Sequence, residues 1–406
     1  MRRVAVTGVG LHSALGDDAE TLFDALLADH SATVAMPDWA RMADLGPHVA
    51  APVPNFDGMH LPRKVRRTMG RVALFGTSAS ERAIESAGLS PEAVAGDRTA
   101  VVMGSTAGSG ASEAEFWSHL VRTNSARGLR STTFFESMAH TVATNVALHF
   151  GVTGEVFSVN CACASSNQAI GLGAERIRLG RAEIVLAGGA EELHAAAAVI
   201  FHSLQAASSG YNARPTETAR PFDADRDGIV IGEGAGVLML EEWSRARARG
   251  ATILGEVVGF GTSCDASNMA HPAPEGMLAA MDRCLKDAGL PPSVVDHVNA
   301  HATGTRAGDA AEAEAIFRLL GDDVPTSSNK GHLGHTLGAC GALESIIALE
   351  AIRRGVLPGT RNLVRPDVAP IFLPRGPLLR PLEYVLKTSF ALGGINSALL
   401  FRHPEA

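Results

Sequence analysis

VNCACASSNQAI, residues 159–170, begins at the end of the apolar run GEVFSV and leads into a segment of small residues that predicts a closely packed helix. The first N–H groups of a helix lack internal partners, and the positive end of its dipole favours a thiolate over a thiol. Cys161 and Cys163 lie where this helix is expected to start, so either could be a nucleophile. The alternative is a pair of buried structural cysteines, since free cysteine is among the most buried residue types.

A later segment repeats this pattern. Residues 335–359, HTLGACGALESIIALEAIRRGVLPG, resemble residues 161–189, CACASSNQAIGLGAERIRLGRAEIVLAGG. Each segment starts with small residues and continues as a longer amphipathic helix. Because internal similarity of this kind indicates a duplicated unit, we expect two related halves, residues 1–250 and 251–406.

Short apolar runs alternate with longer helical patterns along the whole chain, which predicts α/β layers around a mixed sheet. The runs are VAVTGVG (4–10), TAVVMG (99–104), EIVLAGG (183–189), VLMLEE (237–242), ILGEVVGFG (253–261), HVNAHAT (297–303) and LKTSFALGG (386–394). Hydrophobic residues make up 46% of the sequence but aromatic residues only 5%, with 43 glycines, so we expect a core with close backbone approaches.

Composition excludes several classes of protein. A net charge of -8 argues against nucleic acid as the main partner. No stretch reaches the roughly 18 consecutive apolar residues of a membrane helix, and the N-terminal sequence enters a strand-like run without a leader pattern. We therefore expect a cytoplasmic protein with no membrane partner. The five cysteines show no paired ligand spacing, and GVGLHS (8–13) lacks the third glycine of a dinucleotide fingerprint, so neither a metal nor a nucleotide cofactor is expected.

Three further stretches carry chemically active residues: VNAHATGT (298–305), SNKGHLGH (328–335) and FALGGIN (390–396). One cysteine, two histidines, one lysine and a glycine loop in this order resemble the active site of the β-ketoacyl-acyl carrier protein synthases. These are the decarboxylative condensing enzymes of the thiolase superfamily. The resemblance extends over essentially the whole chain through RRVAVTGVG (2–10), RPFD (220–223) and DGIVIGEGAG (227–236).

The resemblance implies a thiolase-like fold of two similar halves in five layers, α-β-α-β-α. It places the nucleophile at Cys163 and makes Cys161 a packed neighbour, at a position where the family usually has Thr or Ser. The backbone N–H groups of Cys163 and Leu392 would form the oxyanion hole. His301 and His335 would donate hydrogen bonds to the malonyl thioester and to the enolate formed from it.

Other site residues follow from the same resemblance. Lys330 would orient or tune His335, and the Glu344 carboxylate would pair with Lys330 inside the site. A purely structural buried ion pair is equally compatible with these two positions. Thr303 and Thr305 would contact the pantetheine arm of the substrate.

The residue pattern also narrows the reaction class. Elongating synthases use two histidines beside the cysteine, whereas thiolases proper carry a second reactive cysteine near the C-terminal glycine loop, which is absent here. The resemblance therefore implies a discrete enzyme that accepts an acyl group on Cys163 and condenses it with a malonyl unit. The alternatives are a non-catalytic chain-length partner subunit and an acyltransferase that does not decarboxylate. Ala391 and Leu392 stand where fatty-acid elongators have Gly and Phe, which favours a specialised polyketide or polyene pathway over housekeeping fatty-acid synthesis.

Partners and substrate contacts complete the expectations. The resemblance implies that acyl carrier protein brings the phosphopantetheine group, so the chain needs no cofactor of its own, and that the chain forms a homodimer or a heterodimer with a related subunit. The acyl pocket and its gate would involve Phe134, Phe135, Ala391 and Leu392. Carrier protein would dock on the basic residues Arg63, Lys64, Arg66 and Arg67.

Overall fold

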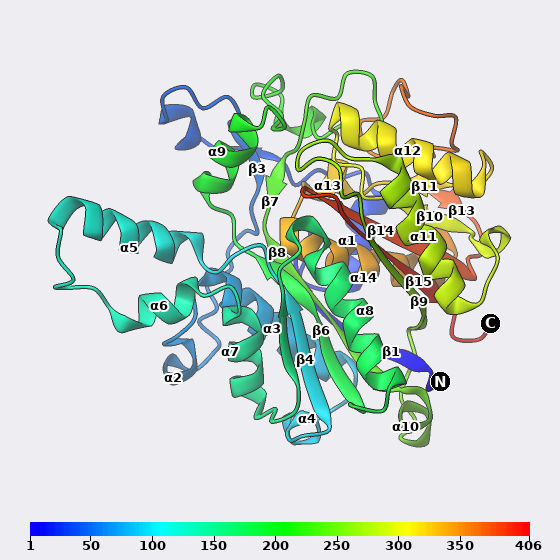
Figure 1. Cartoon of the computed structure of the whole chain (residues 1–406), viewed down its shortest axis with the longest axis horizontal. Coiled ribbons are helices and arrows are strands. Elements are labelled where there is room, and N and C mark those ends of the chain that lie inside the picture. Colours follow the sequence, from blue (N-terminus) through cyan, green and yellow to red (C-terminus); the bar gives the residue numbers. More distant parts are fainter.

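A computed structural model describes all 406 residues, and its first half contains five paired strands. Their spatial order is β1-β8-β6-β4-β5 (Figure 1). The strands are β1 (Val4–His12), β4 (Thr99–Gly104), β5 (Val156–Val159), β6 (Ile184–Glu191) and β8 (Gly234–Glu242).

The second half repeats this arrangement in the order β9-β15-β14-β10-β11. Its strands are β9 (Gly255–Cys264), β10 (His297–Asn299), β11 (Thr326–Ser327), β14 (Tyr384–Ala391) and β15 (Ile395–Arg402). Strand directions match between the halves: β4 runs parallel to β5 and β6, as β10 does to β11 and β14, and the other pairs are antiparallel. A short β1–β9 pairing joins the halves into one ten-stranded sheet.

Helices form the remaining three layers. The middle layer consists of α8 (Ser165–Arg178) and α14 (Cys340–Arg354), which pack against each other and contact strands of both halves. The outer faces are covered by α3 (Arg71–Ser86) with α7 (Thr141–Phe150), and by α11 (Pro274–Ala288) with α12 (Arg306–Leu320). The duplicated α-β-α-β-α architecture expected from the sequence is therefore confirmed, while the division at residue 250 stays a prediction.

Paired glycines explain how each outer helix lies so close to its strand. A Cβ atom at Gly8 or Gly10 of β1 would come within 2.5 or 2.0 Å of a carbonyl oxygen of α3. In the second half, a Cβ atom at Gly259 or Gly261 of β9 would come within 2.4 or 2.2 Å of a carbonyl oxygen of α11. The Gly-x-Gly pattern of residues 8–10 thus serves helix packing.

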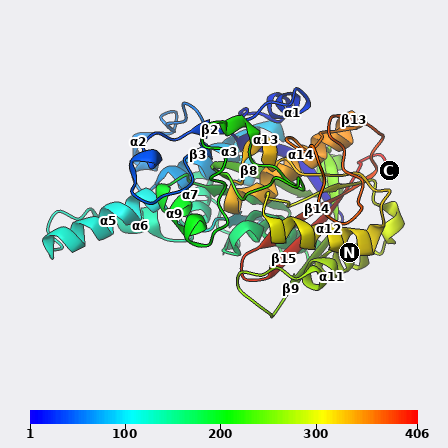
Figure 2. The same ribbon diagram turned by 90° about the horizontal axis from the view of Figure 1, so that it is seen from above.

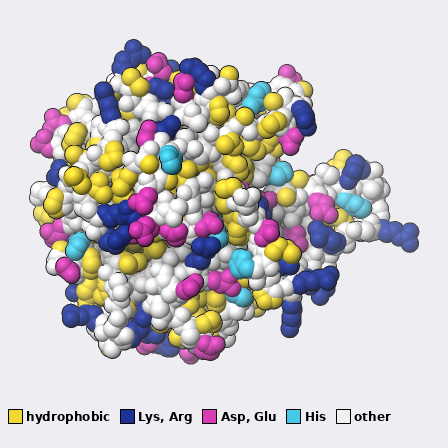
Figure 3. Space-filling model, turned by 180° about the vertical axis from the view of Figure 1, so that it is seen from behind, with side chains coloured by type: hydrophobic (Ala, Val, Ile, Leu, Met, Phe, Trp, Pro, Cys, Tyr) yellow, Lys and Arg dark blue, Asp and Glu magenta, His cyan; other side chains and the backbone are white.

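One long arm stands out from the layered body. It consists of α5 (Gly110–Thr123) and α6 (Ser131–Ser137), which pack on each other and project from the side of the first half (Figures 1 and 2). From behind, the arm carries Lys and Arg side chains among apolar ones (Figure 3). No helix of the protein combines the length and the apolar character needed to cross a membrane.

Shorter elements connect these layers. The short helices are α1 (Ala19–Leu27), η1 (Trp39–Arg41), α2 (Arg63–Arg66), α4 (Pro91–Val94), η2 (Ala162–Ala164), α9 (Ala195–Ser203), η3 (Pro215–Glu217), α10 (Trp243–Ala248), η4 (Pro292–Val294), α13 (Lys330–Leu333) and η5 (Leu337–Ala339). The short strands are β2 (Val34–Ala35), β3 (Val49–Ala51), β7 (Ile231–Gly232), β12 (Val356–Leu357) and β13 (Leu378–Leu379).

Candidate active site

Two strained turns lead into the middle helices. Ala162, at the start of η2, has a φ of 47°, and Leu337, at the start of η5, has a φ of 45°. A side chain in this left-handed region costs about 1–2 kcal/mol, so both turns are held by their surroundings. The η2 and η5 turns contact each other, and the first of them places Cys163 at the start of α8. The duplicated fold therefore builds one site from both halves.

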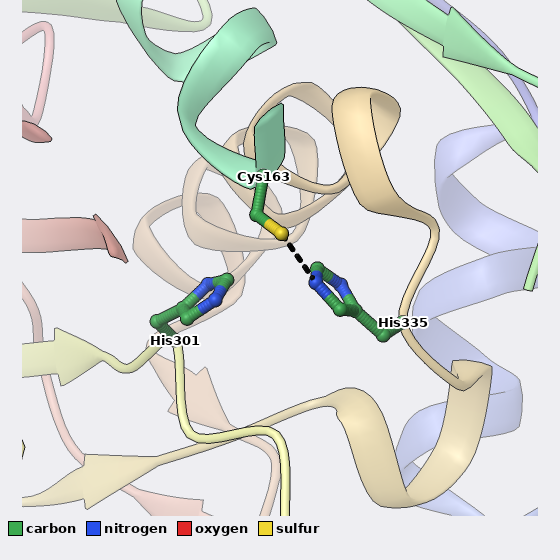
Figure 4. A group of neighbouring side chains, drawn as sticks. All are labelled: Cys163, His301 and His335. Carbon is green, nitrogen blue, oxygen red and sulfur yellow. Dashed lines mark hydrogen bonds between the residues drawn. The ribbon is translucent and has the colours of Figure 1, made fainter. Parts of the chain in front are cut away.

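Cys163 faces His335 directly. Both residues are buried, and the thiol of Cys163 lies 3.0 Å from Nε2 of His335 (Figure 4). Burial raises the pKa of the Cys163 thiol and outweighs the charge of Lys330, which lowers it. The resting cysteine is thus a neutral thiol, and His335 is placed to accept its proton.

His301 lies beside His335, and both rings face the sulfur of Cys163 (Figure 4). It follows β10, and its backbone N–H donates to Glu312 Oε1 at 2.8 Å, which fixes the turn. Its ring centroid lies 5.2 Å from that of His335, with the two planes nearly perpendicular at 83°. Burial, followed by the charges of Lys330 and Lys387, holds the pKa of His335 well below its ordinary value, and the same groups lower the pKa of His301. Both imidazoles are therefore neutral at pH 7.

A buried ion network lies beside the histidines. Lys330 Nζ is 2.5 Å from Glu344 Oε1, and Lys387 Nζ is 2.9 Å from Glu344 Oε2. Burial opposes the charge of Lys330, but the Glu344 carboxylate more than compensates and raises the pKa of this lysine. The site therefore holds two ammonium groups around one carboxylate, close to two neutral imidazoles.

A cavity of about 420 Å³ reaches these groups. Cys163, His301 and His335 line it, and Thr303 and Thr305 lie along it with their hydroxyl oxygens 3.2 Å apart. Ala391 and Leu392, at the end of β14, also line the cavity, together with apolar side chains such as Phe201, Ile229 and Met269. A long substrate with an apolar part and a reactive carbonyl would fit this lining.

Other predicted site residues lie elsewhere. Phe134 and Phe135 are on α6 in the arm, 62% and 44% exposed, and they do not line the cavity of their own chain. Cys161 is half-buried, its thiol donates to Gln168 Oε1 at 3.2 Å, and it does not line the cavity either. The roles proposed for Phe134 and Phe135 would require a second subunit, whereas the contacts of Cys161 agree with a packing role.

The basic residues predicted to dock a partner lie at α2 on the surface. Arg63, Lys64 and Arg67 are exposed, while Arg66 is half-buried and donates from Nε to the Leu61 carbonyl at 2.9 Å. We keep their docking role as a prediction.

The donor atoms of Cys163, His301 and His335 all lie within 4.8 Å of one another. Such closeness allows three groups to act on one small substrate carbonyl or carboxylate. The expectation that no metal is needed stays a prediction.

Comparisons with known proteins agree with this geometry. The family models "Beta-ketoacyl synthase, N-terminal domain" and "Beta-ketoacyl synthase, C-terminal domain" match residues 1–246 and 254–364. The chain belongs to the β-ketoacyl synthase family. A crystal structure of a β-ketoacyl synthase from Burkholderia phymatum superposes with a TM-score of 0.96 at 42% identity, covering 99% of this chain and 100% of the other.

Curated relatives of this β-ketoacyl synthase match over nearly their whole length. Nodulation protein E of Rhizobium sp. (strain N33) is 38% identical, and 3-oxoacyl-[acyl-carrier-protein] synthase 1 of Haemophilus influenzae is 35% identical. Each alignment covers 99% of this chain and 99% of the relative.

Sequence reasoning missed three buried groups of this synthase. Glu312 on α12 accepts from the backbone N–H of His301, Lys387 on β14 pairs with Glu344, and the thiol of Cys340 lies 3.3 Å from the Cys163 carbonyl oxygen. Lys387 had a usable signal, because it is a lone cation within YVLKTSFA, a run that otherwise predicts a buried strand. Glu312 and Cys340 carried no comparable signal, since helices commonly contain both residue types.

Proposed function

We propose that this protein is a discrete β-ketoacyl-carrier-protein synthase that joins an acyl group to a malonyl unit with loss of carbon dioxide. The observation that carries the proposal is the 3.0 Å contact between the Cys163 thiol and His335 Nε2 at the wall of the cavity, with His301 beside both groups. A non-catalytic partner role is disfavoured, because such a subunit would have no use for this nucleophile and its proton acceptor.

The first step transfers the acyl group to the enzyme. His335 Nε2 takes the proton of the Cys163 thiol, and the sulfur attacks the acyl thioester carbonyl. The carbon–sulfur bond to the pantetheine arm breaks, and the departing thiolate takes the proton from His335. This step needs His335 to be uncharged beforehand, which the burial of its ring provides.

The second step forms the carbon–carbon bond. His301 donates a hydrogen bond to the carbonyl oxygen of the malonyl thioester, as does His335 once its ring proton is on Nε2, and the carboxylate leaves as carbon dioxide. The resulting enolate carbon attacks the acyl-Cys163 carbonyl, and the Cys163 sulfur leaves with the bonding pair and takes a proton from solvent. No external base is required, because decarboxylation itself generates the nucleophilic carbon.

Backbone donors and the apolar lining support both steps. We assign the N–H groups of Cys163 and Leu392 to the acyl carbonyl oxygen, where one such donor contributes roughly 2.7–4 kcal/mol in hydrolases. Thr303 and Thr305 are assigned to the pantetheine arm, since both residues line the cavity. The reaction as written uses no cofactor held by this chain.

Acyl carrier protein is the proposed donor of both substrates. Its docking site would be α2, where Arg63, Lys64 and Arg67 are exposed. Attraction between a basic surface and an acidic partner mainly accelerates encounter and sets orientation. We place the reaction in the cytoplasm.

We also infer that the chain works as a dimer, with itself or with a related subunit. Strand β5 is the last strand at one end of the sheet and exposes Val156 and Phe157, while the neighbouring arm exposes Trp117, Phe134 and Phe135. An unpaired apolar edge strand is a ready template for a second copy. Pairing of β5 with a partner strand would bury this edge and bring the arm against the other subunit.

The pathway assignment rests on the mouth of the cavity. Leu392 is 41% exposed there and follows Ala391, whereas fatty-acid elongators carry Phe after Gly. We propose a specialised pathway that handles bulky or unsaturated acyl chains.

Incubation with an acyl-carrier protein, followed by malonyl-carrier protein labelled in its free carboxyl group, tests this function. Intact mass should show one acyl group on the enzyme, and labelled carbon dioxide should then be released in equal amount with the β-ketoacyl product. Acyl loading without carbon dioxide release would indicate a non-decarboxylating acyltransferase instead.

A further inference from the structure

Lys387 is a fully buried cation with no role assigned so far. It lies on β14 at 0% exposure, on the face that its neighbour Val385 turns toward the middle helices. Its ammonium group donates to the Thr388 carbonyl and, at 3.3 Å, to Ser389 Oγ. The third contact is the ion pair with Glu344, at 2.9 Å. Burying an ammonium group without a carboxylate of its own is costly, so this placement calls for a reason.

The Glu344 carboxylate is shared. One oxygen faces Lys330 on α13 and the other faces Lys387 on β14, so three elements meet at this single carboxylate. One carboxylate thus faces two ammonium groups, and one positive charge of these three residues is left without a carboxylate partner.

Other titratable groups around the histidines could neutralise the remaining positive charge of the two lysines. Glu312 on α12 accepts from the His301 N–H and from Thr388 Oγ1, both at 2.8 Å, and burial raises the pKa of its carboxyl. Cys340 on α14 is buried, and burial raises the pKa of its thiol to about 12, so it adds no negative charge. Cys163 itself is a neutral thiol. Glu344 also lies close to the imidazoles, with a carboxylate oxygen within 4.8 Å of a His301 ring nitrogen. The network therefore places two ammonium groups and one carboxylate beside them.

We propose that Lys387 is a positioning residue of the active site, which holds Glu344 between two ammonium groups and so leaves the positive charge of the network directed at His301 and His335. This inference rests on the proposed function only in the role it gives His335 as acceptor of the Cys163 proton.

The charge of Lys387 should affect how the reactivity of Cys163 depends on pH. Burial and the two lysines lower the pKa of His335, so this ring stays uncharged well below its ordinary titration range. Removal of one lysine charge raises that pKa, and His335 is then protonated at a higher pH. A protonated His335 cannot accept the Cys163 proton. As the pH falls, a variant without the Lys387 charge should therefore lose the reactivity of this thiol at a higher pH than the wild type does.

Alkylation of Cys163 by iodoacetamide tests this without any carrier protein. The rate is measured by mass spectrometry of the Cys163 peptide across a pH series, for the wild type, Lys387→Met and Lys387→Gln. Glutamine keeps a hydrogen-bond donor for Thr388 and Ser389, while methionine keeps only the length and the bulk. Lys286→Met removes an exposed lysine of the pair with Asp282 and is the matched control.

Both neutral variants should shift the acid limb of the Cys163 alkylation profile upward by about one pH unit, while Lys286→Met leaves it in place. An unchanged limb in both variants would overturn the proposal. A shift in the methionine variant alone would also overturn it, because loss of hydrogen bonds rather than loss of charge would then be responsible. If one variant does not fold, the position of the acid limb in the other decides.

The same preparations separate this inference from the proposed function. If the wild type neither takes up an acyl group nor releases carbon dioxide, the proposed function fails, yet the alkylation profiles still show whether Lys387 acts on His335.

Discussion

The Cys163 thiol lies 3.0 Å from Nε2 of His335, whereas no comparable contact joins it to His301. The resemblance to condensing enzymes implied that both histidines act on the malonyl half of the reaction. This contact gives His335 a second role, as acceptor of the thiol proton during acyl transfer. The two histidines should therefore differ when each is removed.

His301→Ala should retain acyl loading on Cys163 but lose carbon dioxide release by roughly 10²–10³-fold, the usual cost of one missing donor to a developing negative charge. His335→Ala should impair both steps. Single-turnover loading measured by intact mass, beside release of labelled carbon dioxide, separates the two effects. His60→Ala, at an exposed position, is the control. Equal loss of loading in both active-site variants would contradict this division of roles.

Carrier-protein docking predicts a salt-sensitive effect at α2. The double variant Arg63→Glu, Arg67→Glu should lower kcat/KM for carrier-bound substrates by roughly tenfold or more, because the surface would then repel an acidic carrier protein instead of attracting it. Added salt should lower the kcat/KM of the wild type toward that of the variant, since exposed charges are screened over about 10 Å at 0.1 M. Arg41→Glu, which removes another exposed arginine, should change little. An unchanged kcat/KM in the double variant would place docking elsewhere.

The exposed edge of the sheet predicts the assembly state. Phe157→Glu puts a charge on β5 and should convert a dimer into monomers, which light scattering after gel filtration would detect. Leu379→Glu, on the exposed strand β13, should leave the dimer intact. A wild type that is monomeric and active at micromolar concentration would refute the dimer.

The gate is tested by enlarging Leu392. Leu392→Phe should depress turnover of the longest or most rigid acyl chains by roughly 10–200-fold and spare short saturated ones. A panel of acyl-carrier proteins of different chain length measures this. If all substrates lose activity by one common factor, Leu392 only packs the loop.

Much of the fold was predictable because the two halves share similar segments of small residues. The segments around Cys163 and His335 resemble each other in sequence, and in the structure they become equivalent helices of the middle layer. The glycine pairs of β1 and β9 show the same duplication, since each pair allows the backbone of an outer helix to pack closely on the strand of its half. Patterns of this kind are local, so they are visible without a structure.

The site was predictable in its residues but not in its protonation. Helix-start arguments favoured a thiolate at Cys163, yet burial raises the pKa of this thiol, and burial depends on contacts between distant segments. Lys387 shows the same limit. Strand alternation indicates that its side chain points inward, but its partner Glu344 comes from α14, far away in sequence. Phe134 and Phe135 point to another limit, because their expected role depends on a second subunit.

Acyl loading of variants that each lack one cysteine shows most directly whether Cys163 is the nucleophile. The wild type, Cys163→Ala and Cys161→Ala would each be incubated with acyl-carrier protein, and the modified residue identified by peptide mass spectrometry. We expect one acyl group on Cys163 in the wild type and in Cys161→Ala, and none in Cys163→Ala. An acyl group carried by Cys161, or loading that survives in Cys163→Ala, would contradict it.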